Sequence, residues 1–210
     1  MSQIGRWLVF LVVAAALPAA ETLSVYVGHD ARQPKAPFDA MAREVESLTA
    51  LLGLDVEWRR LERRDPKESS NRLIVLEFRG VCSSEPSTAD VPSGASLAST
   101  LKVGESVLPF AWVECDKLRA MLKTALRDQP GARRDFLMGR AMGRLVAHEL
   151  YHVLAQSREH AAGGIGKSCF HMRDLLSDDF QFDGAALAKV QHQLAGNGSP
   201  DLETSDISSR

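Results

Sequence analysis

The sequence lacks the features that usually mark a nucleic-acid-binding protein. Its formal net charge is -2 at pH 7, aromatic residues make up only 6% of the 210 residues, and no internal repeat is present. A surface that binds nucleic acid or an anionic bilayer is typically basic. We therefore expect no nucleic-acid partner, and the composition favours no membrane partner either.

Long hydrophobic runs are also absent. The longest run, residues 7–17, contains eleven residues, whereas a membrane-spanning helix needs roughly 20. Arg6 precedes this run and Pro18-Ala19-Ala20 follows it, so the segment has the charged start, apolar core and small-residue cleavage site of a secretory signal peptide. A retained anchor is the alternative, and the short run disfavours it. We predict a signal peptide over 1–20 and an extracytoplasmic protein, secreted or periplasmic, that keeps no membrane attachment after cleavage.

Cysteine is scarce as well. The three cysteines are Cys82, Cys115 and Cys169, and no Cys-x-x-Cys pair indicates a metal knuckle or a redox site. Two of three cysteines are expected to pair in an oxidising compartment. Cys82 and Cys115 each follow a strand-like run and a loop separates them, so we predict a disulfide between them and a free thiol at Cys169.

The remaining sequence alternates between strand-like and helix-like patterns. Residues 83–99 are rich in Ser, Pro, Ala and Gly and predict a long surface loop. Pro109 lies in a strand-like run and places that strand at a sheet edge or at a bulge. The predicted strands cover 23–27, 56–61, 73–78 and 107–113, and the predicted helices cover 38–52, 116–127, 133–154, 173–176 and 184–194.

This order of elements predicts an α+β fold whose N-terminal half is α/β-like. A strand, a helix and further strands indicate a mixed twisted sheet with one crossover helix, and a long helix follows. We expect a single domain over 21–195, because about 190 residues are enough for one domain with a substantial core. The polar residues 196–210 predict a disordered tail.

The long helix carries the most informative motif, His148-Glu149-Leu150-Tyr151-His152. Positions four apart lie on the same face of a helix, so both imidazoles can bind one metal ion with Glu149 beside them. The opposite face is apolar and contains Gly139 and Gly143, which predicts close packing on the sheet or on a neighbouring helix. The alternative interpretation is a helix with two surface histidines and a glutamate.

A catalytic zinc (Zn²⁺) site usually has three protein ligands and one open position. His148 and His152 supply two ligands, and His160 is the first candidate for the third because the chain can turn back over the metal after the helix ends. A carboxylate or imidazole from a later segment is the other common solution, which leaves four alternatives open: His171, Asp174, Asp178 and Asp179.

Glu149 is the predicted catalytic residue. It would accept a proton from the attacking water and pass it to the leaving amine, while zinc activates the water and polarises the carbonyl. A structural carboxylate is its alternative role. Two other functions stay open: a zinc-stabilised binding or assembly protein without turnover, and a hydrolase of non-peptide amides.

The motif and the following His160 resemble the zincin metallopeptidases, and the order of strands and helix is similar to the metzincin branch that includes matrixins and astacins. The resemblance implies a zincin-like domain that acts as a zinc-dependent endopeptidase. It also implies an active-site helix under the sheet and a cleft along an edge strand, where a peptide or protein substrate binds as an added strand. By position, His148, His152 and His160 would be the metal ligands and Glu149 the base.

The sequence departs from the metzincin pattern after the second histidine. That pattern has a glycine three residues later and the third histidine three residues further on. Here those positions are Ala155 and Arg158, and the nearest histidine comes two residues late. We therefore expect the turn that leads to His160 to be built differently.

Overall fold

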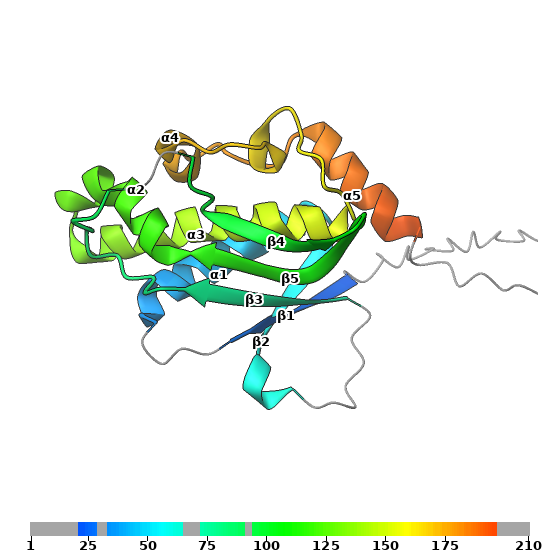
Figure 1. Ribbon diagram of the computed structural model, residues 1–210, viewed down its shortest axis with the longest axis horizontal. Coiled ribbons are helices and arrows are strands. Elements are labelled where there is room, and N and C mark those ends of the chain that lie inside the picture. Colours follow the sequence, from blue (N-terminus) through cyan, green and yellow to red (C-terminus); the bar gives the residue numbers. More distant parts are fainter. Residues whose placement is uncertain (1–20, 29–32, 65–71, 91–93, 197–210) are drawn as a thin grey trace, which may run out of the picture.

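A five-stranded sheet with two long helices on one face forms the framework of the molecule (Figure 1). The computed structural model describes residues 21–28, 33–64, 72–90 and 94–196. The elements follow in the order β1 (Glu21–Val27), α1 (Lys35–Ala50), β2 (Leu54–Arg60), η1 (Leu61–Arg63), β3 (Leu73–Arg79), β4 (Ala98–Val103), β5 (Ser106–Glu114), α2 (Cys115–Arg127), α3 (Gly131–Leu154), η2 (Gly164–Gly166), α4 (Met172–Leu176) and α5 (Gly184–Gly196).

The sheet is mixed, as predicted, with the strand order β2-β1-β3-β5-β4. Strands β2, β1, β3 and β5 are parallel to one another, and β4 alone is antiparallel to its neighbour β5. Helix α1 connects the adjacent parallel strands β1 and β2, which confirms the predicted crossover helix. The predicted α+β fold, with an α/β-like N-terminal half, is therefore confirmed.

Strand β4 was not predicted, because the interpretation of 83–99 as a loop extended into it. The reason lies in its inverted pattern. Thr100 is buried and Lys102 is half-buried, whereas Leu101 and Val103 are 38% and 59% exposed. A strand that turns polar side chains inwards and apolar side chains outwards does not show the usual buried apolar face. The loop therefore ends before Ala98.

Pro109 lies in an interior strand rather than at an edge. The pairing of β4 with β5 steps from Thr100 opposite Ala111 to Lys102 opposite Val107. Pro109 lies opposite this register shift, where an irregular ladder tolerates the missing N–H donor. The sequence predicted that Pro109 lies either at a sheet edge or at a bulge, and in the structure it lies at an irregularity of the ladder.

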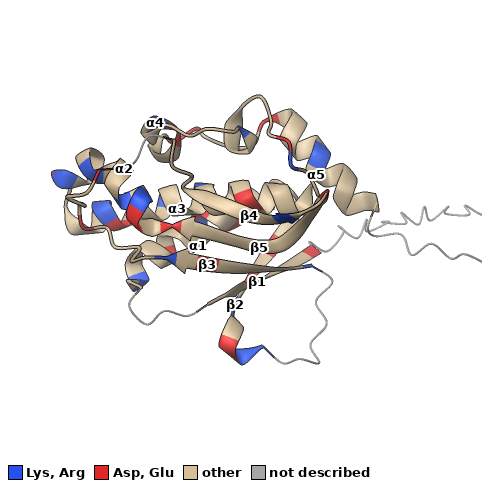
Figure 2. Cartoon of the chain, in the orientation of Figure 1, with Lys and Arg blue, Asp and Glu red and all other residues tan. Residues whose placement is uncertain are grey.

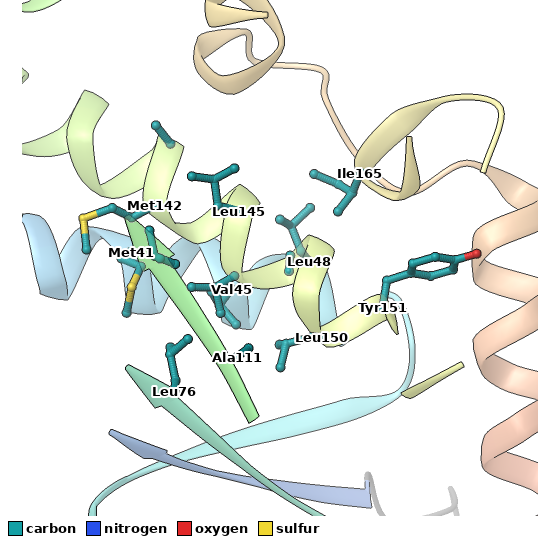
Figure 3. Close-up of a cluster of buried hydrophobic side chains, with 14 of the residues drawn as sticks. Met41, Val45, Leu48, Leu76, Ala111, Met142, Leu145, Leu150, Tyr151 and Ile165 are labelled. Carbon is teal, nitrogen blue, oxygen red and sulfur yellow. The ribbon is translucent and has the colours of Figure 1, made fainter. Parts of the chain in front are cut away.

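Helices α1 and α3 pack unusually closely, and two glycines of α3 make this possible. A Cβ atom added at Gly139 would lie 2.4 Å from the Cβ of Ala40 and 2.5 Å from the carbonyl oxygen of Pro37. At Gly143 it would lie 2.7 Å from the Cβ of Glu44. The glycine face of the motif helix is thus packed on a neighbouring helix. The core between these helices and the sheet contains side chains from all three (Figure 3), among them Met41, Val45, Leu76, Ala111, Met142 and Leu145.

A buried arginine connects this helix pair to the C-terminal segment. Arg144 of α3 is only 2% exposed; its Nε donates to Glu44 of α1 at 2.8 Å, and its Nη1 donates to the backbone carbonyl of Asp174 in α4 at 2.6 Å. Arg140, one turn earlier, donates to the carbonyl of Leu176 and forms an ion pair with Asp178. These contacts hold the chain after the motif against α3.

The predicted disulfide between Cys82 and Cys115 is present, with 4.8 Å between the two Cα atoms, and Cys169 is a free, exposed cysteine as predicted. Within the described part of the chain, no helix has the length and apolar character needed to cross a membrane. The predicted signal peptide lies outside the described residues, and so does the predicted tail beyond Gly196.

The glycine contact predicts a large loss of stability for Gly139→Ala. The added methyl group would overlap Ala40 and the backbone of Pro37, so we expect the free energy of unfolding to fall by about 1–3 kcal/mol. Urea denaturation measures the change. Gly131→Ala is the matched control, because nothing lies within 4 Å of a Cβ at that position. Equal stabilities of the two variants would contradict the proposed role of the contact.

Candidate metal centre

The two histidines of the motif converge on one point. His148 and His152 lie on successive turns of α3 and are only 6% and 2% exposed. Their Nε2 atoms are 3.2 Å apart. Two nitrogens bound to the same tetrahedral zinc ion at the usual bond lengths would lie about 3.4 Å apart. The two imidazoles therefore already have the separation that a shared metal ion requires.

Backbone carbonyls fix the orientation of both rings. The Nδ1 of His148 lies 2.7 Å from the carbonyl oxygen of Ile165, and the Nδ1 of His152 lies 2.7 Å from that of Ser157. Since a carbonyl oxygen only accepts hydrogen bonds, each Nδ1 carries the proton and donates it. Each Nε2 then keeps its lone pair free for a metal ion, which is the usual arrangement of metal-binding histidines.

His160 completes the group from an exposed position beyond the end of α3. One ligand atom from each of His148, His152 and His160 can be chosen so that all three lie within 4.8 Å of one another. The His160 ring stacks on His148 at 5.4 Å and meets His152 edge-on at 4.9 Å between ring centroids. The structure thus brings together the three predicted ligands.

Gln156 shapes the turn that leads from α3 to His160. The backbone takes a positive φ of 45° at Gln156, a conformation that residues other than glycine adopt infrequently. The Gln156 side chain holds the turn in place by donating to the carbonyls of Val153 and Val107. Beyond it, Lys189 of α5 donates to the hydroxyl of Ser157 and to Glu159.

The alternative third ligands lie elsewhere. Asp174 accepts hydrogen bonds from Lys167 and from the backbone N–H of His171, and the side chain of His171 is 83% exposed. Asp178 pairs with Arg140. Among the residues that the structure describes, the only group of three His, Cys, Asp or Glu side chains with suitably close donor atoms is the His148, His152 and His160 group, to which Asp179 does not belong.

Glu149 lies beside the histidines and is 3% exposed. Its Oε2 accepts a hydrogen bond of 2.5 Å from the hydroxyl of Thr100 in β4. Burial raises the pKa of Glu149 to about 7, against the opposing effects of this hydrogen bond and of the positive charge of Lys102. The sequence analysis missed Thr100 because it did not predict β4. Thr100 could have been found only by predicting a strand here with Thr100 on its inner face.

Burial also keeps the histidines neutral. It lowers the pKa of His148 and of His152 to about 4, although the backbone hydrogen bonds of both rings oppose it. Burial likewise lowers the pKa of His160, and the positive charge of Lys102 acts in the same direction on all three rings. Neutral imidazole is the form that binds a metal ion, so the group is in the correct protonation state near neutral pH.

A cavity of about 690 Å³ opens over this group. One wall is formed by β4 and the residues before it, and the other by α3 and the segment 168–170. Tyr151 of the motif does not line the cavity but is buried in the core (Figure 3). A separate cavity of about 450 Å³, lined by Phe38, Trp58 and Phe78 among others, contains none of the predicted site residues.

Comparison with known proteins supports the fold. No family model matches the sequence, and no curated protein matches it. Thirteen chains of solved structures match the structure. One of them is the archaemetzincin of Methanopyrus kandleri, with a TM-score of 0.52 and 13% sequence identity over 87% of this chain and 99% of that chain. The chain therefore has an archaemetzincin-like fold, which agrees with the metzincin-like architecture expected from the order of strands and helix.

The hydrogen bond between Thr100 and Glu149 predicts a measurable contribution to stability. Thr100→Val keeps the shape of the side chain but leaves a buried carboxyl group without its donor, so we expect a loss of about 1–3 kcal/mol in the free energy of unfolding. Thr100→Ser retains the hydroxyl and should lose less. Chemical denaturation of the metal-free proteins compares them, and a valine variant as stable as the serine variant would show that the contact contributes nothing.

Proposed function

We propose that this protein is a zinc-dependent metallopeptidase that acts on peptides or proteins outside the cytoplasm. The observation that carries the proposal is the position of Glu149. A buried carboxyl group lies beside two imidazoles whose Nε2 atoms are 3.2 Å apart and whose Nδ1 protons are held by backbone carbonyls. This combination provides a metal site and a proton acceptor in the same cavity.

The residues present fit a zinc ion. Three neutral imidazoles are a common ligand set for catalytic zinc, and the side of the group that faces the cavity leaves room for a fourth ligand. His148 and His152 are held by their carbonyl partners, whereas His160 lies on an exposed turn. The ligand atoms of the three histidines lie within 4.8 Å of one another, compared with about 3.4 Å for two nitrogens bound to one tetrahedral zinc ion.

Zinc bound at these histidines would lower the pKa of a water molecule towards about 7 and polarise a substrate carbonyl. Glu149 is the residue that moves the proton. A general base must be ionised at the operating pH; burial raises the pKa of Glu149 to about 7 in the metal-free protein, and the charge of a bound zinc ion would lower it. Thr100 fixes one oxygen of the carboxyl group at 2.5 Å and thereby orients it. No nucleophilic side chain is needed.

The cavity supports a peptide as the substrate. Among the described residues, β4 pairs only with β5 and is the edge strand of the sheet on this side. Ala98, Ser99 and Thr100 of β4 line the cavity. An extended peptide could therefore extend the sheet by pairing with the free edge of β4, which would bring its backbone alongside Glu149 and the histidines.

An extracytoplasmic location is part of the proposal. The Cys82–Cys115 disulfide supports it, because structural disulfides persist in oxidising compartments. The other support is the sequence of residues 1–20, which has the parts of a signal peptide.

Two other functions use the same metal group. A zinc-stabilised binding protein would have no need for a carboxyl group buried next to the metal ligands, and Glu149 therefore favours catalysis. A hydrolase of non-peptide amides would use the same chemistry, and the free edge of β4 favours the peptide.

Glu149→Gln tests the catalytic proposal. The amide keeps the shape of the side chain and can still accept the hydrogen bond from Thr100, but it cannot accept a proton. We expect peptide cleavage to fall by at least about 100-fold while zinc remains bound. Mass spectrometry of a complex peptide mixture, with and without a chelator, measures cleavage. Glu105→Gln is the matched control, because Glu105 lies in the exposed turn after β4, with its side chain 97% exposed. Activity that survived in Glu149→Gln would refute the mechanism.

His160→Ala tests the ligand set. We expect the zinc affinity to fall by about 100-fold or more, since the loss of an outer-shell partner alone typically costs 10-fold to 100-fold. The His160 ring is exposed, so the metal-free protein should keep its melting temperature. His171→Ala, which removes an alternative ligand, should leave the zinc affinity unchanged. The reverse result, measured by competition with a chromophoric chelator, would move the third ligand to His171.

A further inference from the structure

Lys102 lies in the wall of the metal-site cavity. It is the only charged residue of β4 (Figure 2). Thr100, two residues earlier, contacts Glu149 of α3, and side chains two apart in a strand point to the same face. The pairing partners of these two residues, Ala111 and Val107, are both buried on that face. Lys102 therefore points towards α3, and it lines the same cavity as the three histidines.

Lys102 forms no ion pair with any described residue that lines the cavity. Of the described residues that line it, Lys102 is the only lysine or arginine and Glu149 is the only carboxylic acid. Glu149 is already hydrogen-bonded to Thr100 and forms no ion pair with Lys102, although the charge of Lys102 acts on it from a greater distance. Within the part of the chain that the structure describes, Lys102 has no side-chain hydrogen bond and no ion pair.

A bound metal ion would make this placement of Lys102 electrostatically unfavourable, and an anion between the two charges would offset the repulsion. An ammonium group beside a site for a divalent cation is repelled by that cation, and the repulsion is stronger in a cavity than in bulk water. Other lysines of the protein form ion pairs, as Lys123 does with Asp90 and Lys189 with Glu159. Among the described residues Lys102 has no such partner, and it lines the cavity in which the substrate would lie.

We propose that Lys102 binds a carboxylate group of the substrate close to the scissile bond, and that the enzyme therefore prefers substrates with a carboxylate there. This inference rests on the proposed peptidase function. A peptide that pairs with β4 would present alternate side chains to the face of Thr100 and Lys102, and an oppositely charged cross-strand pair is favourable. The preferred substrate is thus a peptide with an acidic residue, or with its own C-terminal carboxylate, at this position.

The position of the carboxylate follows from strand geometry. Thr100 contacts Glu149, and Lys102 lies two residues further along β4. Two residues of a strand span roughly 7 Å. The acidic side chain should therefore lie within about two residues of the scissile bond. A C-terminal carboxylate would have to lie at a similar distance from the scissile bond. The two possible sources of the carboxylate can therefore be told apart with two different series of peptides.

The experiment compares pairs of peptides that differ only in one charge. One series exchanges Glu for Gln at each position within three residues of a cleaved bond, and the other exchanges a C-terminal acid for its amide. Each pair is measured in two ways: cleavage by the zinc-loaded enzyme, as kcat/KM, and binding to the Glu149→Gln protein with and without zinc, by fluorescence anisotropy. The variants are Lys102→Met, Lys102→Arg and Lys102→Glu, and Lys35→Met is the control that removes a positive charge outside the cavity.

We expect the wild type to prefer the carboxylate member of one pair by about 10-fold or more, as is typical of a hydrogen bond to a charged group. Lys102→Met should reduce this ratio to near one, Lys102→Arg should retain most of it, and Lys102→Glu should favour a Lys-containing peptide at the same position. Lys35→Met should leave the ratio unchanged. An effect confined to one internal position identifies an acidic side chain, and an effect confined to the acid and amide pair identifies the C-terminal carboxylate.

The two measurements separate this proposal from the peptidase function on which it rests. Cleavage with no charge preference, or with a preference that survives Lys102→Met, overturns the role of Lys102 and leaves the peptidase intact. Charge-dependent binding that requires Lys102, without cleavage of any peptide, supports Lys102 as the carboxylate site and overturns the peptidase. Peptides that are neither cleaved nor bound overturn both.

Discussion

The close contact between α1 and α3 is the constraint on which the other parts of the site depend. Gly139 and Gly143 allow the two helix backbones to approach until a methyl group would no longer fit. With α1 on that side, the opposite side of α3 faces β4 and the chain that follows the motif (Figure 1). A helix fixed in this way holds His148 and His152 in one defined position in the lining of the cavity.

The segments beyond α3 then aim the imidazole rings. The carbonyl groups of Ser157 and Ile165 accept the Nδ1 protons, so both Nε2 atoms point to the same place. These segments are themselves anchored: Lys189 of α5 donates to the Ser157 hydroxyl, and the backbone N–H of Ile165 donates to the carbonyl of Gln181 at 2.9 Å. The geometry of the metal group is therefore a property of the whole C-terminal half rather than of the motif helix alone.

Strand β4 combines a structural and a chemical role, and its inverted pattern is the result. Thr100 and Lys102 face the cavity, while Leu101 and Val103 face solvent. An ordinary edge strand would bury its apolar residues and expose its lysine. The inner face of β4 instead supplies a hydroxyl that orients Glu149 and a cation close to the histidines. The cavity thus contains polar groups from an element that contributes few apolar side chains to the core.

The sequence by itself determined the elements with regular patterns. Helical periodicity located α3 and α1, β-rich runs located β1, β2, β3 and β5, and the spacing of His148, Glu149 and His152 defined the centre of the site, because local geometry places positions four apart on one face. The sequence also identified the Cys82–Cys115 pair. It could not identify β4, whose apolar residues are exposed, and although it favoured His160 as the third ligand it could not exclude His171 and the aspartates. Those outcomes depend on contacts between distant segments: the turn at Gln156, the partners of Ser157 and Ile165, and the register that places Thr100 and Lys102 above α3. Only the tertiary structure decides such contacts, because no local pattern records which groups meet across the fold.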